Sequence, residues 1–303
     1  MFPTRILLAT DGSLESARAA RVAVVLSEGL DSDLHVLHVG HARPVYIAPE
    51  AMIVDAELEE RVRGEAEEEA RKTLVGEVAK IEEMGGDVAR AYVEMGRSDA
   101  EIVRVAEEIG AGLIVVGSRG HGPLRRAVMG SVSCSVVRHA HCPVLVVRSG
   151  GGERDYLPGR ILLALDGSRE ADVAARAAVE ISNVTGSDLH VVYVLRTDPP
   201  MPYPNPVMGE SWEANFERVR RETREFIDER ARRIEAEGGE VRDTHLVFGR
   251  PDEEIVKLSE ELDAGLVVTG SRGLGGIKRA LMGSVSDSVV RHAHCPVLVM
   301  REG

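Results

Sequence analysis

The sequence has little cysteine and no long hydrophobic run. Its 303 residues include 3 cysteines, at positions 134, 142 and 295, and this odd number without a framework spacing indicates reduced thiols. No apolar run reaches the roughly 18 residues that a membrane-spanning helix needs. Residues 1–5 lead straight into a predicted strand and lack the basic region and apolar core of a signal peptide. We therefore expect a cytoplasmic protein with no membrane partner.

Basic residues are also fewer than acidic residues. The chain has 37 lysines and arginines against 50 aspartates and glutamates, which gives a net charge of −13. Binding to a nucleic-acid backbone requires a basic surface. The composition therefore argues against a nucleic-acid partner.

What the chain does contain is an internal repeat. The segment RILLATDGS at 5–13 returns as RILLALDGS at 160–168, and most residues of 117–148 recur at 270–301. Domains usually contain about 100–200 residues. Each copy has about 150 residues, so the repeat predicts two complete domains rather than a solenoid. We place the domains at residues 1–149 and 155–303, with a glycine-rich, flexible linker at 150–154.

Each copy alternates strand patterns with helix patterns. In the first copy the predicted strands are 5–10, 33–39, 88–94, 113–116 and 143–147, and the predicted helices are 13–28, 57–83, 99–109 and 131–139. Strands separated by helices form parallel sheets with right-handed crossovers and helices on both faces. The sequence therefore predicts an α/β fold, twice.

The same glycine spacing follows the fourth predicted strand of each copy. Its pattern is Gly-x2-Gly-x9-Gly-Ser, formed by Gly117, Gly120, Gly130 and Ser131 and by Gly270, Gly273, Gly283 and Ser284. Glycine lets the backbone approach a ligand closely, and the N–H groups at a helix start point at an anion. Arg119 and Arg272 lie inside the pattern, where a cation could help to neutralise a phosphate. The pattern predicts a phosphate or nucleotide ligand in each copy.

Two further strand ends belong to the same edge of the predicted sheet. Asp11 and Asp166 follow the first strand of each copy, and Val39 and Val194 end the second. Ligands of open α/β sheets bind outside the carboxyl ends of the strands. The aspartate could accept hydrogen bonds from an adenine amino group or a ribose hydroxyl, and the valine backbone could pair with an adenine edge. An Asp-Gly-Ser turn that only caps a helix is the alternative interpretation of the aspartates.

These motifs resemble those of the universal stress protein family, in its tandem two-domain, ATP-binding type. The resemblance rests on the glycine pattern, the Asp-Gly-Ser turn and the closing His-Cys-Pro-Val segment, and it covers nearly the whole chain. It implies two Rossmann-like domains, each an open five-stranded parallel sheet of order 3-2-1-4-5. It also implies ATP contacts from Asp11, Val39, Gly117, Gly120, Gly130, Ser131 and Val132, and from Asp166, Val194, Gly270, Gly273, Gly283, Ser284 and Val285.

The resemblance further implies an ATP-binding regulator of a stress or dormancy response. The chain has no Gly-x4-Gly-Lys-Ser/Thr motif and no paired carboxylates beside the glycines, so we expect at most slow ATP hydrolysis, with Mg²⁺ bridging the phosphates. The alternative is an adenylate-handling enzyme of the related fold, which transfers an adenylyl or phosphoryl group. Both copies keep the pattern, so we expect two competent sites.

Other features of the sequence have two interpretations. The His-Ala-His-Cys segments at 139–142 and 292–295 could ligate zinc or copper, but a structural role at a helix end is favoured. The basic pairs at 125–126 and 278–279 either line the phosphate end of the pocket or lie on the surface. The proline-rich segment at 197–206 is a stiff surface loop or a lid over the site.

The last strand of each copy is apolar and is expected at a sheet edge. Apolar edges favour pairing with another strand. We therefore expect 144–147 and 297–300 to pair antiparallel within the chain as a pseudo-dimer, while chain-to-chain dimers follow from the resemblance. Any regulatory protein partner is unknown from the sequence.

Overall fold

The chain forms two compact units, Met1–Ser149 and Gly150–Gly303. The computed structural model describes residues 4–41, 56–120, 129–148, 159–197, 212–273 and 282–301. The predicted linker, both basic pairs and the proline-rich segment beyond its first residue lie outside the described residues. The exact domain limits, 1–149 and 155–303, stay a prediction.

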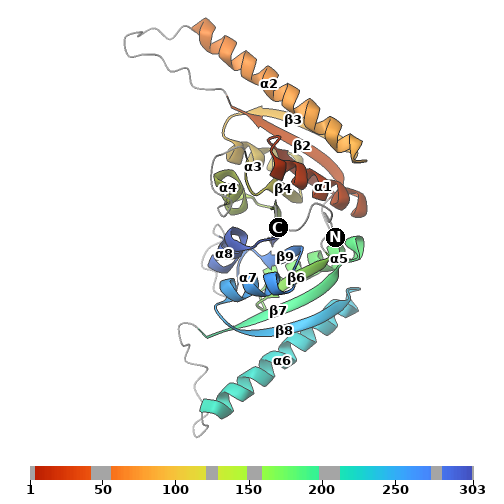
Figure 1. The fold of residues 1–303 in the computed structure, drawn as a ribbon, viewed down its shortest axis with the longest axis vertical. Coiled ribbons are helices and arrows are strands. Elements are labelled where there is room, and N and C mark those ends of the chain that lie inside the picture. The colour runs from red at the N-terminus through yellow and green to blue at the C-terminus, as the bar shows by residue number, and fades with distance from the viewer. Residues whose placement is uncertain are drawn as a thin grey trace, which may run out of the picture. The chain divides into compact units, whose positions relative to one another are not determined.

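The first unit alternates strands and helices along the chain (Figure 1). Its elements are β1 (Arg5–Thr10), α1 (Leu14–Gly29), β2 (Asp33–Gly40), α2 (Ala56–Glu83), β3 (Val88–Met95), α3 (Ser98–Ile109), β4 (Leu113–Gly117), α4 (Ser131–His139) and β5 (Val144–Val147). The predicted strands and helices are all confirmed, and their ends differ from the prediction by one residue at most.

The second unit repeats this sequence of elements. They are β6 (Arg160–Leu165), α5 (Arg169–Thr185), β7 (Asp188–Arg196), α6 (Trp212–Ala236), β8 (Val241–Gly249), α7 (Pro251–Glu261), β9 (Leu266–Gly270), α8 (Ser284–His292) and β10 (Val297–Met300). Each element of the first unit therefore has a counterpart in the second.

Each unit contains a parallel sheet with helices on both faces. The strand order is β3-β2-β1-β4-β5 in the first unit and β8-β7-β6-β9-β10 in the second, so the predicted order 3-2-1-4-5 is confirmed twice. In the first unit α1 and α2 pack together on one face, while α3 and α4 pack together on the other. In the second unit α5 and α6 share one face, while α7 and α8 share the other.

The central strands are buried because helices cover them on both sides. Ile6, Leu7 and Leu8 of β1 and Ile114 and Val115 of β4 are 0 % exposed. A strand that is buried on both faces has a continuous apolar sequence, which is the pattern that the strand prediction used. The buried centre of the first sheet thus positions the ends of β1 and β4.

Two further features concern the cysteines and the hydropathy of the helices. No disulfide joins the three cysteines, all of which lie in the described part of the chain; Cys142 and Cys295 are buried and Cys134 is half-buried. Among the described helices, none combines the length and the hydropathy needed to cross a bilayer.

Candidate functional site

The carboxyl ends of β2, β1 and β4 meet at one edge of the first sheet. Thr10, the last residue of β1, is paired with His38 of β2, and Ala9 is paired with Val116 of β4. Asp11 therefore follows β1 between Val39 on one side and the glycine segment on the other. The strand order 3-2-1-4-5 reverses its direction between β1 and β4, which is the position where open α/β sheets bind ligands.

Asp11 lies directly against the glycine segment. Its Oδ1 accepts the N–H of Ser13 at 3.0 Å, and a Cβ added to Gly120 would lie 2.2 Å from its Oδ2. Real Cβ contacts do not reach such a distance, so a side chain at position 120 would displace the Asp11 carboxylate from its place. Ser13 also caps α1 by accepting the N–H of Ser16 at 3.2 Å. The turn that the alternative interpretation expected is therefore present, and the same aspartate also faces the glycines.

The second unit reproduces this geometry at the end of β6. Asp166 Oδ1 accepts the N–H of Ser168 at 2.9 Å, and Ser168 caps α5. A Cβ added to Gly273 would lie 2.1 Å from Asp166 Oδ2. Val194 lies in β7, next to β6 in the sheet, as Val39 lies beside β1.

The helix after the glycine segment begins without a side-chain cap. Gly130 is the N-cap residue of α4 and Gly283 that of α8, and neither helix start has a side-chain cap hydrogen bond. The first N–H groups of a helix have no partner within the helix. The residues that carry them, Ser131 and Val132 in the first unit, are exposed. A helix N-terminus of this kind can hold an anion.

The remaining glycines bring the segment close to α1 and α5. A Cβ on Gly117 would lie 2.9 Å from the backbone of Glu15, and one on Gly270 would lie 2.9 Å from the Cβ of Glu170. Gly117 is half-buried and Gly270 is buried, while Ser284 is exposed and Val285 half-buried at the start of α8. The sequence-predicted residues of each copy thus gather at one sheet edge.

The two arginines of the pattern form ion pairs with glutamates. Arg119 contacts Glu15 at 2.9 Å and Arg272 contacts Glu170 at 3.7 Å. The side chains are 21 % and 14 % exposed in the first pair, so both charges are largely removed from water. A role for Arg119 and Arg272 in neutralising phosphate stays a prediction. It requires each arginine to contact the phosphate while it keeps its ion pair with the glutamate.

Three serines in or just after the glycine segments have surroundings that the sequence did not reveal. Ser133 Oγ donates to the carbonyl of Gly117 at 2.7 Å, which ties α4 to the end of β4. Ser118 and Ser271 are 2 % and 1 % exposed, and their hydroxyls have no hydrogen-bond partner among the described residues. Buried polar groups normally have a partner. The recurrence of a serine at both positions was the available sequence signal.

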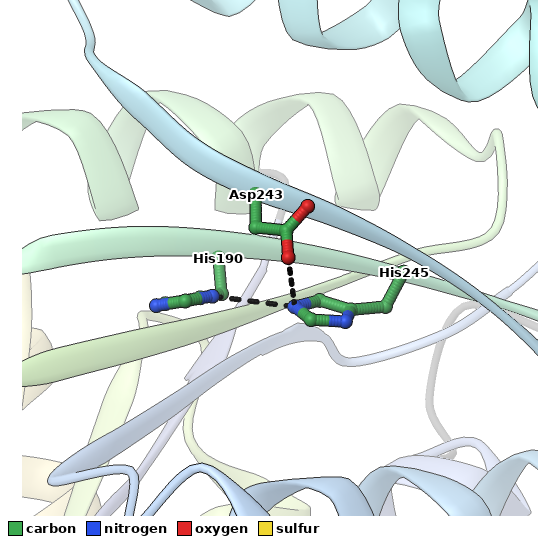
Figure 2. Close-up of side chains that lie close together, drawn as sticks. All are labelled: His190, Asp243 and His245. Carbon is green, nitrogen blue, oxygen red and sulfur yellow. Dashed lines mark hydrogen bonds and ion pairs between the residues drawn. The ribbon is translucent and has the colours of Figure 1, made fainter.

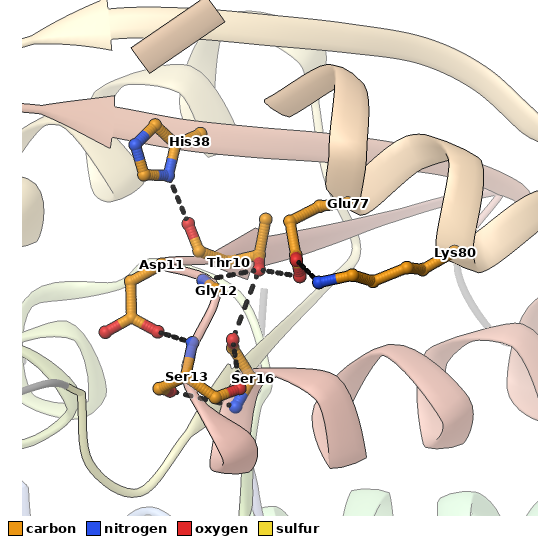
Figure 3. Close-up of polar contacts among 8 residues, drawn as sticks. All are labelled: Thr10, Asp11, Gly12, Ser13, Ser16, His38, Glu77 and Lys80. Atoms are coloured by element: carbon orange, nitrogen blue, oxygen red, sulfur yellow. Dashed lines mark hydrogen bonds and ion pairs between the residues drawn. The ribbon is translucent and has the colours of Figure 1, made fainter. Parts of the chain in front are cut away.

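A buried polar network lies behind Asp11 in the first unit (Figure 3). Thr10 Oγ1 donates to Glu77 Oε2 at 2.9 Å, and Lys80 contacts the other oxygen of Glu77 at 2.6 Å. His38 Nδ1 lies 2.9 Å from the carbonyl of Thr10 and therefore donates its proton to it. Glu77 is 5 % exposed, so α2 brings a carboxylate into the interior next to the end of β1.

The corresponding place in the second unit is aromatic. Tyr193 contacts Phe226 edge to face with ring centroids 5.6 Å apart, and Arg230 lies over the Phe226 ring and pairs with Asp172. Burial and, after it, the charge of Asp166 raise the pKa of Tyr193. The two sites therefore share their glycines and aspartates but differ in the side chains behind them.

The His-Ala-His-Cys segments lie at helix ends. His139 Nδ1 is 2.8 Å from the carbonyl of Ser135, and His292 Nδ1 is 2.8 Å from that of Ser288. His141 contacts Glu107 at 3.5 Å. These contacts give the first histidine of each segment a structural partner one helical turn back.

Comparisons with known proteins place this geometry in a family. A family model described as the universal stress protein family matches residues 3–148 and 158–301. A universal stress protein of Mycolicibacterium smegmatis is 30 % identical over 98 % of this chain and 96 % of its own length. One of Mycobacterium tuberculosis is 29 % identical over 98 % of this chain and 97 % of its own length.

A solved structure agrees with these matches over the whole chain. The crystal structure of a universal stress protein from Archaeoglobus fulgidus has a TM-score of 0.64 at 25 % identity, and the match covers 99 % of this chain and 96 % of that one. The family model matches twice, once in each unit. The chain therefore belongs to the universal stress protein family and contains two tandem copies of its domain.

Proposed function

We propose that the chain binds ATP at two sites, one in each unit, and acts as a nucleotide-dependent regulator of a stress or dormancy response. The observation that carries the proposal is the meeting of an aspartate, a glycine segment and an uncapped helix start at the reversal point of the strand order. It occurs in both units. Family membership supports the stress-related role.

The proposal gives each group of residues a separate task. The carboxylates of Asp11 and Asp166 would accept hydrogen bonds from the nucleoside, and the backbones of Val39 and Val194 would meet the adenine edge. The phosphates would lie against the glycine segments and the starts of α4 and α8, where partial positive charge favours an anion.

The residues present fit a phosphate group at this place. Gly120 has no side chain and lies against the Asp11 carboxylate, so the backbone there is bare, and the first N–H groups of α4 have no side-chain cap. The hydroxyl of Ser118, buried in the same segment, has no partner among the described residues. A phosphate group has several oxygens that can accept hydrogen bonds from these N–H groups and from this hydroxyl.

We propose binding with at most slow hydrolysis. Fast phosphoryl transfer needs cations and a water-positioning group around the transferred phosphate. Here Arg119 is paired with Glu15, and Asp11 accepts the N–H of Ser13. Mg²⁺ would act by bridging the phosphates, because it commonly takes few protein ligands. Rapid multiple turnover with Mg²⁺ would instead favour the adenylate-handling enzyme.

The test is a double variant, Gly130→Asp with Gly283→Asp. The backbone angles of both glycines, with φ of −66° and −67°, suit any residue, and aspartate is a good N-cap. An added Cβ would lie 3.2 Å from the carbonyl oxygen of Ser118 or Ser271, so circular dichroism should first show that the variant is folded. The new carboxylates would occupy the helix starts and repel phosphate, so we expect ATP binding by calorimetry to fall by at least about a hundredfold. Unchanged binding would show that the phosphate position is wrong.

The matched control is Gly64→Asp with Gly159→Asp. An added Cβ at these two glycines meets nothing within 4 Å. This control adds the same charge to the chain and should bind ATP as the parent does. Mass spectrometry of small molecules released from freshly purified, denatured protein would identify the nucleotide and separate ATP from AMP or cyclic AMP.

A further inference from the structure

Three side chains of types that commonly bind metal ions lie close together on β7 and β8, the two outer strands of the second unit (Figure 2). His190 lies on β7, and Asp243 and His245 lie on β8. His190 Nδ1 is 3.2 Å from His245 Nε2, and His245 Nε2 is 3.9 Å from Asp243 Oδ2. One ligand atom from each residue lies within 4.8 Å of the other two.

The strand register brings these side chains to one face of the sheet. His190 is paired with Asp243, and Val192 is paired with His245, in a parallel ladder. Residues 243 and 245 are two apart, so their side chains point to the same face. The rings of His190 and His245 stack with centroids 5.5 Å apart.

Burial favours the neutral form of His190. His190 is 7 % exposed, and burial is the main cause that lowers its pKa; the charges of His245 and Arg160 lower it further, while Asp188 and Asp243 act in the opposite direction. Metal ligation requires a neutral imidazole. His190 is therefore ready to act as a ligand at neutral pH.

The spacing of the three atoms suits a transition-metal ion. Zinc binds histidine nitrogen at about 2.0–2.1 Å, so the ligand atoms of a tetrahedral site lie about 3.3 Å apart. Two of the three separations, 3.2 and 3.9 Å, are near this value, and the third lies within 4.8 Å, so side-chain movements of about 1 Å or a little more would close the site. Thr244 donates its N–H to Asp243 Oδ1 at 2.8 Å, which leaves Oδ2 on the side of His245.

An ion can reach this place from solvent. The side chain of Asp243 is 62 % exposed and that of His245 is 19 % exposed. A water molecule can therefore supply the fourth ligand, as in zinc sites that have three protein ligands.

The first unit provides an internal comparison. His35 occupies the place of His190, and it is paired with Arg90, while Leu37 is paired with Tyr92. His35 Nδ1 lies 3.0 Å from the Tyr92 hydroxyl, and Arg90 lies over the Tyr92 ring. The fold therefore accepts an arginine and a tyrosine here, and it does not require the aspartate and histidine of the second unit.

We propose that His190, Asp243 and His245 bind one divalent transition-metal ion, with zinc as the best match to two imidazoles and a carboxylate. The site lies near the start of β7, four residues before Val194, or about 13 Å along the strand. It is thus separate from the proposed nucleotide site and does not depend on it. A histidine pair that is linked only by a hydrogen bond is the alternative.

The experiment is zinc titration of the metal-stripped full chain by calorimetry. His245→Tyr and Asp243→Arg install the first unit's residues, which the same strand pairing already accepts, and each should weaken zinc binding by at least about tenfold. Asp243→Asn is a milder second variant. Circular dichroism should show that the variants stay folded.

A reverse exchange tests whether these residues are sufficient. Arg90→Asp combined with Tyr92→His in the first unit should add a second zinc equivalent, because His35 already lies in position. Cobalt(II) should give visible absorption bands of a four-coordinate site with the parent chain and lose them with His245→Tyr.

A control separates this site from the His-Ala-His-Cys segments. Cys142→Ser with Cys295→Ser should leave zinc binding unchanged. The proposal is overturned if the parent chain binds no zinc, if His245→Tyr and Asp243→Asn bind as tightly as the parent, or if the cysteine variant loses the ion instead.

Discussion

At the scale of single residues, the close contact between Asp11 and Gly120 determines the candidate site. The aspartate follows β1 and the glycine follows β4, and they meet because these strands are neighbours in the sheet. The sequence supplied both residue types and their places at strand ends. It could not supply the ion pair between Arg119 and Glu15, since that contact joins segments more than 100 positions apart.

Gly120→Ala tests this contact. The added methyl group would lie 2.2 Å from Asp11 Oδ2 and would displace the carboxylate. We expect ATP affinity of the first site to fall at least about tenfold, which corresponds to about 1.4 kcal/mol. Gly64→Ala, in open space on α2, is the control and should leave affinity intact. Normal binding by Gly120→Ala would mean that Asp11 is not a ligand contact.

A pair of serines separates structural capping from ligand binding. Ser13 caps α1, so Ser13→Ala should lower the free energy of unfolding by about 1 kcal/mol. Ser131 is exposed at the start of α4, where no side-chain cap is formed, so Ser131→Ala should change stability by less than about 0.5 kcal/mol and weaken ATP binding. Urea unfolding and calorimetry measure both. A large stability loss in Ser131→Ala would contradict this assignment.

At the scale of elements, the strands and helices follow from sequence patterns, but their side-to-side contacts do not. The apolar runs of β1 and β4 and the glycine at the end of α3 mark element limits directly. The His190 group was missed because it depends on the register between β7 and β8, which no local pattern defines. The different surroundings of the two nucleotide sites were also missed. They come from side chains of α2 and α6, and the packing of these helices against the strand ends is not visible in a local sequence pattern.

These surroundings predict unequal nucleotide sites. Glu77 and Thr10 form a polar network behind the first site, whereas Tyr193 and Phe226 lie behind the second. Gly283→Asp alone should leave only the first site, and Gly130→Asp alone only the second. We expect the two remaining affinities for ATP to differ by at least about threefold in calorimetry. Identical affinities would mean that the residues behind the sites do not affect binding.

The contact between α3 and α4 predicts a pH effect. The hydrogen bond from Ser135, at 2.7 Å, is the main cause that lowers the pKa of Asp99. A carboxyl group with a lowered folded pKa stabilises the fold above its unfolded pKa, about 3.9, and loses this contribution as pH falls through the folded pKa. Ser135→Ala should therefore cost about 1 kcal/mol at pH 7 and less near pH 3, as measured by urea unfolding. A cost that does not change with pH would contradict this.

At the scale of the whole molecule, the chain duplicates one domain and has kept the glycine pattern and the aspartate after the first strand in both copies. The internal repeat of the sequence predicted two domains, because the same motifs follow the same strands in both copies. Pairing of the two apolar edge strands and formation of chain-to-chain dimers stay predictions. Solution scattering of the purified chain is the measurement that checks them.

The central claim is that each unit holds one adenine nucleotide. Native mass spectrometry of the full chain with ATP and Mg²⁺ tests it most directly, because it counts bound molecules on one chain. We predict two nucleotides per chain, one after Gly130→Asp or Gly283→Asp alone, and none after both. A parent chain that binds no adenine nucleotide at millimolar concentration would contradict the account.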